Sequence, residues 1–128
     1  MSDEPVNLRY MVEDPLASAD WYVEMFGFSK LPNSSPAFAA VEKGPLRLLL
    51  SGKMSSAGRA MPDGRQPVPG GWNRFQVIVT DIEAEVARLR SKDVKFLNDI
   101  VKGPGGQQIL VEDPSGNIVE IFQSAGFF

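Results

Sequence analysis

The chain has no histidine and no cysteine among its 128 residues. Without imidazole it lacks the side chain that ordinarily serves as a general base near neutral pH, and without thiols it lacks a thiolate nucleophile and a soft metal ligand. Catalytic triads and zinc sites built on these residues, and the iron site of two histidines and one carboxylate, are therefore excluded. Any catalysis has to use carboxylates, hydroxyls, tyrosine, lysine, arginine or metals bound through oxygen.

Charge clusters and long apolar runs are missing as well. The 13 basic and 16 acidic residues are interspersed and give a net charge of −3, which does not form the basic face expected of a nucleic-acid-binding protein. Residues 1–4 lack the basic and apolar regions of a signal peptide, and no apolar run has the length of a membrane span. The absence of cysteine is compatible with the cytoplasm. We expect a cytoplasmic protein with one domain over residues 1–128 and no nucleic-acid or membrane partner.

The first half of the chain predicts a strand, a helix and three further strands. Apolar and polar residues alternate over residues 6–12, as in a strand. Asp14 and Pro15 favour a helix start, so residues 16–26 are predicted to be helical up to Gly27. Short strands are predicted over residues 28–31, 37–41 and 46–50.

The second half repeats this order. Residues 72–79 alternate again, and Asp81 precedes a predicted helix over residues 82–90 in which Ile82, Val86 and Leu89 share one face. Strands are predicted over residues 94–97, 108–111 and 117–122. Each half therefore predicts a βαβββ unit, over about residues 5–51 and 72–123.

Two glycine-rich segments remain. The linker over residues 52–71 is long for a connection, so it either simply joins the halves or closes over a pocket as a lid, to which Arg59, Met61, Asp63 and Arg65 would contribute. Residues 103–106 are not a phosphate loop, because no lysine with serine or threonine follows and no helix begins there. They predict a hairpin connection.

Three features together resemble the vicinal oxygen chelate superfamily, which includes glyoxalases, bleomycin-resistance proteins and extradiol dioxygenases. They are the duplicated units, the block Asp14-Pro15-x-x-Ser18-x-x-x-Tyr22-x-x-x-Phe26-Gly27-Phe28, and the ending Asp113-Pro114-Ser115-Gly116-Asn117-x-x-Glu120. The resemblance covers essentially the whole chain. It implies an α+β fold in which two βαβββ repeats form a cup-shaped eight-stranded sheet, and it implies a homodimer.

In that superfamily a metal, where present, is held by side chains on the first and fourth strands of each half. Carried over by position, the resemblance assigns these sites to Asn7, Leu48, Arg74 and Glu120. Only Glu120 is a usual ligand, and Arg74 would place a permanent cation beside the metal. We therefore expect neither a metal nor a cofactor.

Strand alternation predicts which side chains line the cup. If Leu8, Tyr10 and Val12 face the helices, the opposite face carries Asn7, Arg9, Met11, Leu46, Leu48, Leu50, Trp72, Arg74, Gln76, Ile78, Ile118, Glu120 and Phe122. A mainly apolar lining with a few polar groups is typical of a small-molecule site. The predicted ligand-binding residues are Asn7, Arg9, Leu48, Trp72, Arg74, Gln76, Glu120 and Phe122; Trp72 and Phe122 offer rings on which planar ligands stack.

Glu120 is the one candidate catalytic residue, and two interpretations stay open for it. It is either a structural partner of Arg74 or Arg9, or it anchors the polar end of a ligand or acts as a general base. Because a neighbouring arginine stabilises the charged carboxylate, binding ranks above catalysis.

The leading hypothesis is a metal-independent protein of the glyoxalase and bleomycin-resistance type that binds a small, partly apolar organic molecule in the cup. The alternative is a metal-assisted lyase, isomerase or dioxygenase of the same superfamily that uses Glu120. A third class is an interaction module whose cup is filled by its own side chains. Phe127 and Phe128 offer some support for the homodimer, since a partner subunit would cover their apolar rings.

Overall fold

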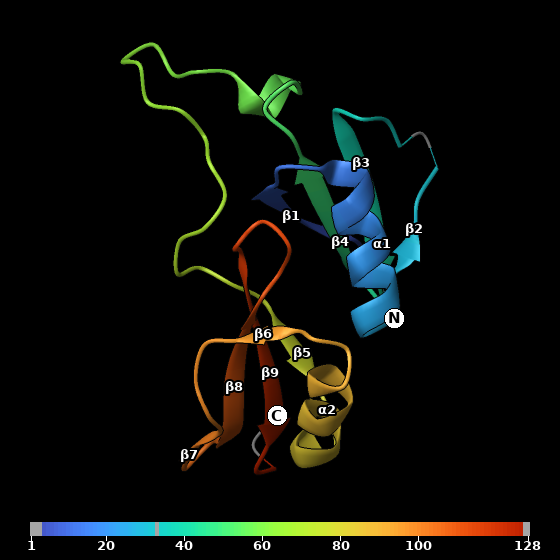
Figure 1. The fold of residues 1–128 in the computed structure, drawn as a ribbon, viewed down its shortest axis with the longest axis vertical. Coiled ribbons are helices and arrows are strands. Elements are labelled where there is room, and N and C mark those ends of the chain that lie inside the picture. Colours follow the sequence, from blue (N-terminus) through green and yellow to red (C-terminus); the bar gives the residue numbers. More distant parts are fainter. Residues whose placement is uncertain (1–3, 33, 127–128) are drawn as a thin grey trace. The chain divides into compact units, whose positions relative to one another are not determined.

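The computed structural model describes residues 4–32 and 34–126. Phe127 and Phe128, which the sequence analysis places against a partner subunit, lie outside these ranges. The chain forms two compact units that divide between Gly70 and Gly71, and each unit has one helix lying against its own sheet (Figure 1). None of the helices in the described residues is long and apolar enough to cross a membrane.

The first unit contains the first predicted repeat. Its elements are β1 (Val6–Met11), α1 (Pro15–Phe26), β2 (Ser29–Lys30), β3 (Phe38–Lys43) and β4 (Leu46–Ser51), followed by the short helix η1 (Ser56–Gly58) in the linker. The sheet order is β1-β4-β3-β2, in which β1 runs parallel to β4 and the other pairs are antiparallel. The predicted order of one strand, one helix and three strands is therefore correct for this unit.

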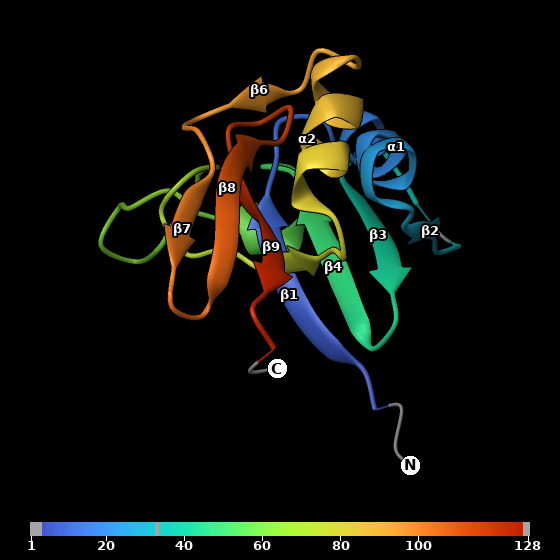
Figure 2. The same ribbon diagram turned by 90° about the horizontal axis from the view of Figure 1, so that it is seen from below.

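The second unit has the same order with one strand more. Its elements are β5 (Gln76–Ile78), α2 (Ile82–Arg90), β6 (Lys95–Phe96), β7 (Val101–Gly103), β8 (Gly106–Glu112) and β9 (Ile118–Ser124). The sheet order is β5-β9-β8-β6, and β7 also pairs with β8, beside which it lies in Figure 2. β6 corresponds to the strand predicted over residues 94–97, whereas β7, which also pairs with β8, was not predicted.

The helix ends follow from local sequence signals. The Asp14 carboxylate accepts a hydrogen bond from Ala17 N at 3.1 Å, and Gly27 ends α1 with a φ of 72°, in the left-handed region that glycine adopts without strain. The Asp81 carboxylate accepts from Ala84 N at 3.1 Å in the same way. In α2, acidic residues in the first turn and basic residues in the last turn interact favourably with the helix dipole.

The predicted strand bounds differ from the observed ones, most of all in β5. Residues 72–75 are not part of β5, because only Gln76–Ile78 pair with β9. The glycine cluster 103–106 connects β7 to β8 as a hairpin, which confirms the interpretation of that segment. Gly106 is required here, since a Cβ atom would lie 2.2 Å from the carbonyl oxygen of Gln123.

Each unit has a core between its helix and one face of its sheet. In the first unit the buried residues of α1, among them Ala19, Tyr22 and Phe26, are accompanied by buried residues of the strands, namely Tyr10, Ala39, Val41, Leu48 and Leu50. In the second, Ile82, Val86 and Leu89 of α2 are accompanied by Val77, Ile109, Val111, Val119 and Ile121. The opposite face of each sheet is not covered by the helix of its unit.

Candidate functional site

Glu120 lies in the middle of β9, on the sheet face opposite the buried core residue Ile121. It is directly paired with Gln76 of β5 and is only 4% exposed. Arg74 Nε donates to Glu120 Oε1 at 2.8 Å, and Gln76 Nε2 donates to Glu120 Oε2 at 2.6 Å. Both carboxylate oxygens are therefore engaged by donors of the same unit, and Arg74 is the arginine that forms the ion pair.

Arg74 is placed by the segment that precedes β5. Its Nη1 also donates to the carbonyl oxygen of Trp72 at 3.2 Å, and its side chain is 27% exposed. A guanidinium has five N–H donors, of which these two contacts use only part. Arg74 can therefore hold Glu120 and still hydrogen-bond to the polar end of an added molecule.

The surroundings of this cluster are largely apolar. The strand register places Ile78, Leu110 and Phe122 on the same face as Glu120. Phe122 is buried and, with Gly106 and Gln108, lines a hollow of about 170 Å³. Trp72, which we expected as a wall of the site, is instead 74% exposed. The hollow alone is smaller than the pockets of about 300 to 1,000 Å³ that hold most small ligands.

The first unit carries two further predicted residues on β1. Arg47 Nε donates to Asn7 Oδ1 at 2.8 Å, and Arg9 Nη1 donates to Ser51 Oγ at 3.0 Å. Asn7 and Arg9 are both exposed. The amide oxygen is the one side-chain atom of Asn7 that can bind a metal. It already accepts a hydrogen bond from the Arg47 guanidinium.

The structure corrects the assignment of Leu48. Leu48 pairs with Leu8 and is fully buried, so it belongs to the core face and not to the face that carries Asn7 and Arg9. Leu46 and Leu50 share that face with it. Leu49 is the β4 residue opposite Arg9, as Glu120 is opposite Gln76 in the second unit.

The residues at the expected metal positions do not fit a metal. The two strands of the first unit offer an engaged amide at Asn7 and no donor at either Leu48 or Leu49. The second unit offers a carboxylate whose two oxygens are bound by Arg74 and Gln76. Within residues 4–32 and 34–126, no group of three or more Asp and Glu side chains is arranged to hold a metal ion.

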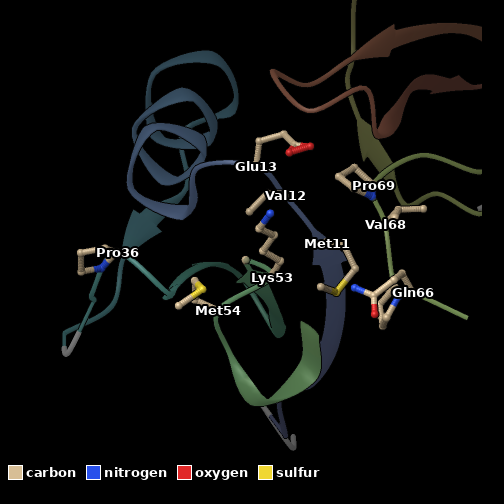
Figure 3. Close-up of a pocket in the computed structure, with 11 residues that line it drawn as sticks. Met11, Val12, Glu13, Pro36, Lys53, Met54, Gln66, Val68 and Pro69 are labelled. Atoms are coloured by element: carbon tan, nitrogen blue, oxygen red, sulfur yellow. The ribbon is translucent and has the colours of Figure 1, made fainter. Parts of the chain in front are cut away.

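The linker forms one wall of a larger pocket, which the sequence did not locate. This pocket of about 430 Å³ lies wholly in the first unit, between residues 66–69, the end of β1 and residues 52–54 (Figure 3). Arg59, Met61, Asp63 and Arg65, the residues expected to contribute if the linker closed, are not among its lining residues. The sequence signal that could have located this pocket is the Pro67-Val68-Pro69 segment. Alternating prolines restrict the backbone, and a stiff segment can form one side of a pocket.

Comparisons with known proteins give a consistent result. The sequence profile of the Glyoxalase/Bleomycin resistance protein/Dioxygenase superfamily matches residues 6–121. Among solved structures, the chain is similar to a lactoylglutathione lyase from Agrobacterium tumefaciens, with a TM-score of 0.76, 20% identity and 98% of each chain covered. It is also similar to TioX from Micromonospora sp. ML1, with a TM-score of 0.74, 20% identity, and 94% of this chain and 98% of that chain covered. A superfamily member from Sphaerobacter thermophilus has a TM-score of 0.75 and 23% identity, with 97% and 98% covered. A search of curated proteins finds no match.

Proposed function

Because the chain belongs to the Glyoxalase/Bleomycin resistance protein/Dioxygenase superfamily, we propose that it is a metal-independent member that binds a small, partly apolar organic molecule. The observation that carries this proposal is the engagement of Glu120. Its two oxygens accept from Arg74 and Gln76, and a divalent metal at that carboxylate would lie beside a permanent cation. The remaining donors of Arg74 and the apolar neighbours of Glu120 suit a ligand with one polar end.

The same geometry favours binding over catalysis at Glu120. A general base has to be within hydrogen-bond reach of a substrate proton, whereas Glu120 is only 4% exposed and each of its oxygens already accepts a hydrogen bond from the protein. Glu120 therefore acts in this proposal by holding Arg74 in place, and Arg74 contacts the ligand. We further propose that the protein is a cytoplasmic homodimer.

The proposal is tested by thermal unfolding of the EDTA-treated protein with added metals or organic compounds. We expect Zn²⁺, Ni²⁺, Mn²⁺ and Fe²⁺ to leave the melting temperature unchanged, and some members of a library of aromatic and antibiotic-like molecules to raise it. A ligand that binds only the folded state at one hundred times its Kd stabilises it by about 2.7 kcal/mol, which shifts the melting temperature measurably. Stabilisation by one divalent metal would contradict metal independence and favour a metal-assisted lyase, isomerase or dioxygenase.

Replacing Glu120 by glutamine tests the role of the cluster separately. We expect Glu120→Gln to unfold at nearly the same temperature as the wild type, because the new amide accepts from Arg74 and the Gln76 amide can rotate to accept from it. Affinity for a compound found in the thermal screen should fall by about tenfold, since the charge that orients Arg74 is lost. Equal affinities of both proteins across the set of binding compounds would remove Glu120 from the site.

A further inference from the structure

The pocket beneath the linker has the size of a ligand site and a lining that the family assignment does not explain. Its volume of about 430 Å³ lies within the range of about 300 to 1,000 Å³ that holds small organic molecules. It shares no residue with the Arg74, Gln76 and Glu120 cluster. The kind of ligand that this pocket can bind therefore depends on its own lining residues.

Most of the residues that line the pocket are apolar. Met11 and Met54 supply thioethers, which adapt to the outline of a ligand and make favourable contacts with aromatic rings. Val68 and Pro69 line the pocket on the side of the linker (Figure 3), and Pro67 also belongs to its lining. Methionine thioethers and proline rings together offer apolar contacts that suit a planar, unsaturated body.

One cation projects into this apolar space. The Lys53 side chain extends from the end of β4 toward Val12, with its ammonium inside the ring of lining residues (Figure 3). Lys53 has no ion-pair or hydrogen-bond partner within residues 4–32 and 34–126. Glu13 also lines the pocket, but it takes part in another interaction. Of the two charged residues that line the pocket, Lys53 is therefore the one without a partner in the described residues.

The backbone that carries Lys53 is held in one conformation. Gly52 N donates to the carbonyl oxygen of Ala37 at 3.0 Å, and Ser55 Oγ donates to the carbonyl oxygen of Gly52 at 2.6 Å. The buried Gly58 packs against this turn so closely that a Cβ atom would lie 2.5 Å from Lys53 Cα. Lys53 is therefore presented from a fixed position, which lowers the entropy lost on binding.

The linker wall is also ordered before any ligand arrives. Met61 N donates to the carbonyl oxygen of Arg65 at 2.8 Å, and Arg65 pairs with Asp63 at 2.9 Å, which closes a turn directly before the wall. Pro67 and Pro69 then restrict the backbone of residues 66–69. A pocket built between two constrained segments is a preformed site, as small-molecule sites usually are.

We propose that this pocket binds a small planar organic anion, with its unsaturated body against the methionines and the prolines and its carboxylate on Lys53. The inference goes beyond the proposed function, because the pocket and the Glu120 cluster have no residue in common and either assignment can fail alone. Gln66, at the edge of the prolines, offers an amide for a further hydrogen bond to the ligand.

The test uses naphthoate as the probe, with neutral naphthamide and cationic naphthylmethylamine as matched compounds. Titration calorimetry on the full chain should give a Kd for naphthoate about tenfold lower than for naphthamide, as expected for a charge-assisted hydrogen bond, and weaker binding still for the amine. Amide NMR shifts should change at residues 11–13, 53–54, 66 and 68. Equal affinities for the acid and the amide, or shifts confined to other residues, would overturn the proposal.

Three variants complete the test. Lys53→Gln should bind naphthoate about tenfold more weakly and erase the preference over naphthamide. Val68→Asp, at an exposed position of the wall, should weaken naphthoate by a similar factor through charge repulsion. Lys92→Gln, an exposed lysine outside the pocket lining, should leave the affinity unchanged. Unchanged naphthoate affinity in both pocket variants would sink the assignment, whereas a failure of the Glu120→Gln prediction would bear only on the proposed function.

Discussion

Leu48→Ala is expected to lower the free energy of unfolding by about 3 kcal/mol, while Leu49→Ala lowers it by only about 1 kcal/mol. Leu48 is 0% exposed and lies on the core face with Leu8, whereas Leu49 is part-exposed on the opposite face. Truncation of a fully buried leucine leaves a cavity in addition to the lost transfer free energy. Urea denaturation of both variants, followed by circular dichroism, measures the difference.

The two leucine variants form a matched pair, since they change the same side chain on adjacent residues of β4. A ligand found in the thermal screen should keep its affinity in Leu48→Ala, because that side chain points away from the face of Asn7 and Arg9. A larger loss of stability in Leu49→Ala than in Leu48→Ala would mean that the register of β1 and β4 is shifted by one residue. Such a shift would return Leu48 to the set of candidate ligand-binding residues.

Arg74→Met is expected to lower the free energy of unfolding by about 2–3 kcal/mol, a value below the 3–5 kcal/mol of fully buried pairs because Arg74 is 27% exposed. Methionine keeps most of the apolar contact of the arginine stem but leaves the Glu120 carboxylate without its ion pair at a buried position. The penalty arises from the unpaired charge and not from lost packing. Denaturant unfolding at neutral pH and low salt measures it.

The double variant Arg74→Met with Glu120→Met separates these two causes. Replacing both partners of a buried pair by apolar residues of similar size is often neutral, so the double variant should regain most of the stability that Arg74→Met loses. Gln76 is exposed, and water can replace Glu120 as the acceptor for its amide. Stability in the double variant as low as in Arg74→Met would show that packing of the arginine, and not its charge, is what the cluster needs.

Local sequence signals were enough to predict α1, α2 and, apart from η1 and β7, the order of the elements. The bounds of α2 agree with the predicted residues 82–90, and those of α1 differ from the prediction by one residue. Asp14, Gly27 and Asp81 act at these ends as predicted. Caps involve hydrogen bonds between residues three to five positions apart, so the information is local and can be read along the chain. The partnership of Glu120 with Arg74 was also among the predicted alternatives, because a buried carboxylate needs a partner and few cations share its face.

Only the tertiary structure decided the register of β4 and the place of the pocket. Arg47 and Ser51 share the face of Leu49 and were the local signal for it, but the residues of β1 beside them are fixed only by pairing across a long stretch of chain. A slip of one residue would reverse the side chains of one strand relative to its partner, and the alternation within one strand does not fix that pairing. The pocket likewise depends on the path by which residues 66–69 return to Met11, and that path is set by the turn at residues 61–65 and the packing of Gly58 on Lys53. These contacts are non-local, and the sequence showed only that the linker was long and rich in glycine and proline.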